Sequence, residues 1–138
     1  MLLKMTRRNA AALLLTSLAI AQAQAAAPVL VEVFAYAHPP VAEALKPVRE
    51  MLARQGAAVR VLEIDLDQPD AEKRVAALGV KGHVAALILV GGQRSFKRAD
   101  GSALEFVNFP AGSAGPAAMR STWTPAELQT VIARYKAK

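Results

Sequence analysis

The chain has 138 residues, a formal net charge of +6 and no cysteine. Disulfide bonds, thiol nucleophiles and thiolate metal ligands are therefore excluded, and the folded state must be stabilised by packing. Aromatic residues are few and the basic residues are scattered along the chain, so we do not expect a nucleic-acid-binding surface.

The segment 1–25 has the three parts of a secretory signal peptide. Lys4, Arg7 and Arg8 precede an apolar run at residues 10–20, and the AQA sequence at 23–25 supplies a cleavage site. The apolar run is shorter than the roughly 20 residues of a membrane-spanning helix, so an uncleaved anchor is the less favoured alternative. A lipoprotein anchor is excluded because no cysteine follows the run.

Cleavage after Ala25 leaves 113 of the 138 residues, at positions 26–138. It removes three of the 17 basic residues and none of the 11 acidic ones, which lowers the net charge from +6 to +3. A chain of this length suits a single domain. We expect this domain in the periplasm or outside the cell, with no stable membrane anchor after cleavage.

The first predicted elements are a buried strand and an amphipathic helix. Residues 29–36 (VLVEVFAY) are almost all β-formers, and the prolines after His38 end the strand. Apolar residues at helical spacing then predict a helix over 41–52 that ends before Gly56. Pro47 lies inside this helix, where we expect a kink.

The next segments continue an alternation of strands and helices. Residues 58–66 predict a second strand, residues 69–78 a short helix that begins at a proline, and residues 84–90 (VAALILV) a third strand. Short links in this order favour parallel pairing of the first strands and right-handed crossovers.

The second half of the chain predicts a hairpin, a loop and a final helix. Gly91-Gly92 marks a tight turn, after which residues 94–97 return antiparallel as an edge strand. Residues 103–109 predict one more strand, and residues 110–122 a long surface loop. Residues 124–137 begin with a capping box (TPAE) and predict a helix.

This order of elements resembles the thioredoxin superfamily over residues 29–96 and 124–137. Glu32 stands where the family often keeps a buried acid, and Pro47 stands near its helix-kinking proline. Residues 79–85 (GVKGHVA) are similar to the segment that leads into the family's cis-proline. The resemblance implies a three-layer α/β fold for residues 26–138, with a central mixed sheet of four to five strands flanked by helices.

Two departures from the family decide what this domain cannot do. The sequence His38-Pro39-Pro40-Val41 replaces the Cys-x-x-Cys motif, and Val84 replaces the cis-proline. A cis bond before a non-proline residue costs about 2.5–4 kcal/mol, so we expect a trans peptide at Val84. Thiol–disulfide exchange requires a thiolate, and the usual redox activities of the family are therefore excluded.

The two histidines of the chain are the main candidates for chemistry. The resemblance implies that the loops carrying His38 and His83 face each other at one end of the sheet. Imidazole is a good ligand for copper or zinc, but two histidines fall short of the usual four zinc ligands. Glu32 is a conceivable helper, although as a strand residue it is more simply a structural or edge-exposed carboxylate. The alternative is two surface histidines with no shared role.

Other nucleophiles give no support for an enzyme. No serine lies in a G-x-S-x-G context, and the Gly112-Ser113-Ala114-Gly115 segment does not connect a strand to a helix. Lys97 and the two arginines beside it (Arg94 and Arg98) form a small basic patch that favours solubility.

The sequence therefore predicts a non-catalytic binding or adaptor module without a resident cofactor. In this interpretation a periplasmic protein or peptide binds a groove at one end of the sheet. The groove residues are Tyr36, His38, Pro39, Pro40, His83 and Val84. The alternative is a copper- or zinc-binding protein that uses His38 and His83, and the loop at 110–122 is a second candidate contact surface.

Overall fold

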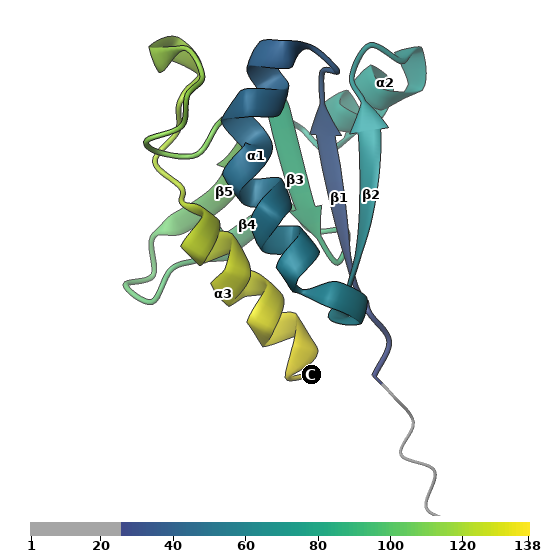
Figure 1. The fold of residues 1–138 in the computed structure, drawn as a ribbon, viewed down its shortest axis with the longest axis vertical. Coiled ribbons are helices and arrows are strands. Elements are labelled where there is room, and N and C mark those ends of the chain that lie inside the picture. The colour runs from purple at the N-terminus through teal and green to yellow at the C-terminus, as the bar shows by residue number, and fades with distance from the viewer. Residues whose placement is uncertain (1–25) are drawn as a thin grey trace, which may run out of the picture.

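The computed structural model describes residues 26–138, so the expected signal peptide at 1–25 lies outside the described residues. Five strands and three helices follow one another in this part of the chain (Figure 1). They are β1 (Val29–Ala35), α1 (Pro39–Arg54), β2 (Val59–Asp65), α2 (Pro69–Ala77), β3 (Ala86–Val90), β4 (Ser95–Lys97), β5 (Ala103–Val107) and α3 (Pro125–Lys136). None of these helices combines the length and the apolar character that a membrane crossing requires.

The strands form one open mixed sheet in the order β2-β1-β3-β5-β4. β1 and β2 are parallel, whereas β3 is antiparallel to β1, and β5 is antiparallel to both β3 and β4. The predicted mixed sheet is therefore confirmed. The parallel pairing predicted for the first strands is confirmed for β1 and β2 and wrong for β3. The third strand runs in the opposite direction, which places the loop before β3 beside the end of β1.

The predicted antiparallel return of residues 94–97 along β3 is wrong, whereas their predicted place at the edge of the sheet is confirmed. β4 has no ladder with β3, and only the single bridge between Val90 and Gln93 remains of it. Instead β5 lies between β3 and β4. Its side chains alternate, and Leu104 and Phe106 are buried, whereas β4 is short and mostly exposed. Burial of the more apolar strand therefore decides which of the two takes the inner position.

Helices cover both faces of the sheet, because successive side chains of a strand point to opposite faces. Val31 and Val33 of β1 belong to a large core with α1 and α3 on one face. Phe34 and Leu87 belong to a smaller core on the other face, which α2 covers. The arrangement is a three-layer α/β/α domain in which β1 and β3 are central.

Several element boundaries differ from the sequence prediction. α1 begins at Pro39, directly after the N-cap residue His38, because proline suits the first turn of a helix. The helix continues through Pro47. β5 ends at Val107, and Asn108 has a left-handed backbone with φ of 59°, a conformation that asparagine tolerates better than most residues.

The loop at 110–122 is packed against the domain. The backbone of Phe109 bonds to Met119 and Ser121, and the ring of Phe109 lies against Gly115 so closely that a Cβ there would clash. The indole N–H of Trp123 donates to the carbonyl of Val107 at 2.9 Å. These contacts hold the loop and lead the chain into α3.

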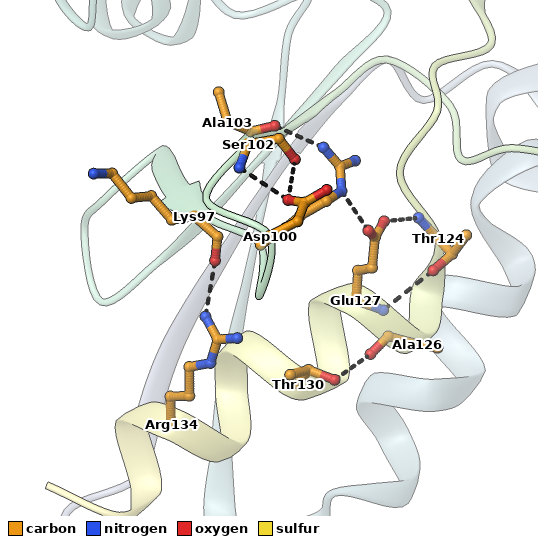
Figure 2. Close-up of polar contacts among 10 residues, drawn as sticks. Lys97, Asp100, Ser102, Ala103, Thr124, Ala126, Glu127, Thr130 and Arg134 are labelled. Carbon is orange, nitrogen blue, oxygen red and sulfur yellow. Dashed lines mark hydrogen bonds and ion pairs between the residues drawn. The ribbon is translucent and has the colours of Figure 1, made fainter.

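The predicted capping box at the start of α3 is confirmed (Figure 2). The Thr124 hydroxyl accepts the backbone N–H of Glu127, and the Glu127 carboxylate accepts the backbone N–H of Thr124. The same carboxylate pairs with Arg98 at 2.6 Å. The hydrogen bond from Arg98 is the main reason why the pKa of Glu127 lies below its ordinary value.

Candidate binding site at the end of β1

The ring of Tyr36 lies directly after β1 and is half-buried. The imidazole of His38 stacks on it with ring centroids 5.7 Å apart, and the imidazole of His83 does so at 5.9 Å. His38 reaches this position as the N-cap of α1, and His83 lies in the loop that precedes β3. The two histidines, 45 positions apart in the sequence, thus contact one aromatic ring.

A carboxylate from the next turn approaches this cluster. His38 Nε2 lies 3.6 Å from Asp67 Oδ2, and both side chains are more than half exposed. The backbone N–H of Asp67 donates to the carboxylate of Asp65, which fixes the turn after β2. Because it is exposed to water, this pair contributes little to stability and leaves the imidazole accessible.

A small cleft of about 150 Å³ opens beside Tyr36, between the end of β1 and α2. Three of the predicted groove residues line it, namely Tyr36, His83 and Val84. The sequence prediction missed the remaining lining residues, which come from α2 and the segments on either side of it: Leu66, Glu72, Val75, Ala76, Val80 and Gly82. In the sequence, Val75 and Ala76 are simply residues of a predicted short helix, and Leu66 and Val80 lie just outside it.

The other predicted groove residues lie outside this cleft. Pro39 and Pro40 are exposed on the first turn of α1, and His38 reaches the site only through its contact with Tyr36. The cleft therefore lies on the α2 side of the sheet, and Pro39 and Pro40 do not line it.

Asn108 holds the loop that carries His83 and Val84. Its Oδ1 accepts the backbone N–H of Ala85 at 2.8 Å, and its own N–H donates to the carbonyl of Ala86 at 2.7 Å. Within residues 26–138 every peptide bond is trans, so the expectation for Val84 is confirmed. A side chain from the end of β5 thus fixes one wall of the cleft.

Glu32 is buried beneath the site and is not exposed at a sheet edge, because β1 lies between β2 and β3. Its carboxylate accepts a hydrogen bond from Arg74 of α2 at 2.6 Å. The guanidinium of Arg74 also lies 4.9 Å from the centre of the Phe34 ring. This contact ties α2 to the sheet and engages the carboxylate of Glu32.

The cluster around Tyr36 places two imidazoles against one ring and does not by itself complete a metal site. In the part of the chain that the structure describes, no group of three or more histidine, aspartate or glutamate side chains could hold a metal ion. Two imidazoles supply half of a tetrahedral zinc shell. What the residues form is a small cleft of mixed polar and apolar lining, which includes the ring of Tyr36 and the imidazole of His83.

The chain was compared with protein families, curated proteins and solved structures. No family model, no curated protein and no solved structure matches the chain. The function must therefore be inferred from the site itself.

Proposed function

We propose that residues 26–138 form an exported thioredoxin-like domain that binds an extended peptide or protein segment at the cleft beside Tyr36, without thiol redox chemistry. The order β1-α1-β2-α2-β3, with β1 and β2 parallel and β3 antiparallel, supports the thioredoxin-like assignment. The absence of cysteine from the whole sequence supports a role in binding and not in redox catalysis. The signal-like segment at 1–25 supports a periplasmic or secreted location.

The size of the cleft favours a peptide over a small molecule. Sites for small molecules usually occupy about 300–1,000 Å³, whereas this cleft holds about 150 Å³. That space suits one side chain. Val75, Val80 and Val84 form the apolar part of the wall, beside the polar Glu72 and His83. We infer that an apolar side chain enters against the valines. The observation that carries the proposal is this single-residue cleft beside an exposed imidazole and the Tyr36 ring.

The rest of the peptide would cross the mouth of the cleft. The phenol of Tyr36 and the imidazole of His83 line the cleft, and both rings can exchange hydrogen bonds with a peptide backbone. We therefore expect affinity to depend on one apolar anchor residue and to tolerate changes at the flanking positions.

An array of immobilised heptapeptides, each with a single apolar residue at its centre and polar residues around it, tests the proposal. Ala76→Phe places a ring in the cleft, because Ala76 lines it. Ala77→Phe is the matched control, since Ala77 is the next residue of α2, is also exposed and does not line the cleft. We expect wild type and Ala77→Phe to retain peptides and Ala76→Phe to lose them. Equal retention by all three proteins would refute the proposal.

A second candidate function is the binding of copper or zinc. It rests on the two imidazoles at one ring and on the 3.6 Å approach of Asp67 to His38. It is the weaker candidate, because the cluster supplies fewer ligands than a closed site needs.

A further inference from the structure

β2 lies at one end of the sheet, and its outer edge carries no further strand in the described part of the chain. All seven of its residues pair with β1 on the inner side. Figure 1 shows β2 at the right of the sheet with no strand beyond it, and α2 near its upper end. Its outward backbone groups are therefore available to another strand.

The side chains of this edge are unusually apolar for an exposed strand. Val61 is 39 % exposed and Leu62 is 40 % exposed, and no other large hydrophobic side chain of residues 26–138 is as exposed. As consecutive strand residues they point to opposite faces. Proline and bulges, which often protect an edge strand, are absent from β2. Its charged side chains are Arg60, Glu63 and Asp65, and they leave Val61 and Leu62 uncharged at the middle of the edge.

One hydrogen bond settles which backbone groups point outward. The N–H of Leu66 donates to the carbonyl of Ala35, which belongs to β1. Because the direction of backbone groups alternates along a strand, the even-numbered residues of β2 face β1. The N–H and C=O groups of the odd-numbered residues, Val61 and Glu63 among them, therefore point away from the sheet.

We propose that β2 pairs antiparallel with β2 of a second copy of this chain, with Leu62 on the two-fold axis. In this register Val61 exchanges two backbone hydrogen bonds with Glu63 of the second copy, and Leu62 faces Leu62 across a non-hydrogen-bonded position. Arg60 lies opposite Ile64, so no like charges face each other. An axis at Glu63 would instead place two carboxylates opposite each other.

Features beside the strand favour a second copy as the occupant. Arg49 holds the Glu63 carboxylate toward α1 through two hydrogen bonds of 2.9 and 3.0 Å, which keeps this charge off the edge. A hollow of about 320 Å³ between α1 and β2, lined by Leu52, Ala53 and Val61 among others, extends the apolar surface onto α1. The strand is also self-complementary about Leu62, a property that a foreign peptide does not require.

The expected dimer is reversible. Pairing over about five residues buries less surface than the roughly 1,200–2,000 Å² of a stable interface. We therefore expect a monomer–dimer equilibrium that depends on protein concentration. If the β2 edge bound a foreign peptide instead, the purified protein would remain monomeric. The experiments below distinguish this case from the dimer.

The absence of cysteine makes the register directly testable. A Leu62→Cys variant carries one thiol, and residues at a non-hydrogen-bonded position have Cα atoms about 4.5 Å apart, within the range of a disulfide. Arg60→Cys is the matched control on the same strand, because its two thiols would be about 13 Å apart in this register. Under mild oxidation we expect a covalent dimer of Leu62→Cys only. Equal cross-linking of both variants would overturn the register.

Sedimentation equilibrium of the purified protein tests the dimer without cross-linking. Leu62→Lys places two ammonium groups opposite each other on the axis, and Ala133→Lys adds the same charge at an exposed position of α3. We expect wild type and Ala133→Lys to associate as concentration rises, and Leu62→Lys to stay monomeric with an unchanged circular dichroism spectrum. A wild type that remains monomeric at the highest concentration would overturn the proposal, whatever the array of peptides shows for the cleft.

Discussion

Asn108 is the residue whose replacement tests the account of the site most sharply. It combines a left-handed backbone, with φ of 59°, and a side-chain hydrogen bond to the backbone N–H of Ala85. Asn108→Ala removes the acceptor and keeps a Cβ in the left-handed region. Asn108→Gly removes the same acceptor but tolerates the backbone conformation. The two variants therefore separate the two contributions.

The magnitudes follow from the geometry. A partly buried N–H that loses its acceptor costs about 1–2 kcal/mol, and alanine in the left-handed region costs about 1 kcal/mol more. We expect Asn108→Ala to lower the free energy of unfolding by about 2–3 kcal/mol, and Asn108→Gly by about 1–2 kcal/mol. Both variants release the chain at Val84–Ala85, so peptide binding at the cleft should weaken as well.

Urea denaturation followed by circular dichroism measures both differences. The order of stability should be wild type, then Asn108→Gly, then Asn108→Ala. If Asn108→Ala were as stable as wild type, the hydrogen bond to Ala85 would not hold the loop. If Asn108→Gly were the less stable variant, the backbone conformation would not be the source of the additional cost.

Three further predictions concern the last helix and the histidines. Thr124→Ala should lower the free energy of unfolding by about 1 kcal/mol and the melting temperature by about 4 °C, measured by thermal denaturation. The pKa of Glu127 is lowered chiefly by its hydrogen bond from Arg98, so its contribution to stability is complete above its unfolded-state pKa of about 4.3 and disappears as pH falls through the folded-state value. The stability difference between wild type and Glu127→Gln should therefore shrink below that range in urea titrations, and a constant difference would contradict this cause. For metals, we expect calorimetric titration with zinc to show no tight binding, because His38 and His83 supply too few ligands. Tight binding that a His38→Ala/His83→Ala variant abolishes would instead establish the second candidate function.

The sequence predicts the parts of the fold that depend on local patterns. The continuous β-formers of β1, the helical spacing in α1 and the capping box at Thr124 each specify an element within a few residues. The alternation of strands and helices also suffices for a mixed sheet with helices on both faces. These features depend on periodicity and on side chains close in the sequence, which a single chain displays directly.

The remaining features depend on contacts between distant residues. The competition between β4 and β5 for the place beside β3 is decided by burial of Leu104 and Phe106 in the assembled core. The pairing of Glu32 with Arg74 joins residues 42 positions apart. The cleft beside Tyr36 combines the predicted residues Tyr36, His83 and Val84 with residues of α2, which only the packing of α2 on the sheet brings beside them.

The central claim is that the cleft beside Tyr36 binds a peptide through one apolar side chain. A ¹H–¹⁵N correlation spectrum of the labelled protein, titrated with the best peptide from the array, tests it most directly. We expect shifts concentrated at Tyr36, Ala76, His83 and Val84, which line the cleft. Shifts confined to the β2 edge or to α3, or no shifts at all, would contradict it.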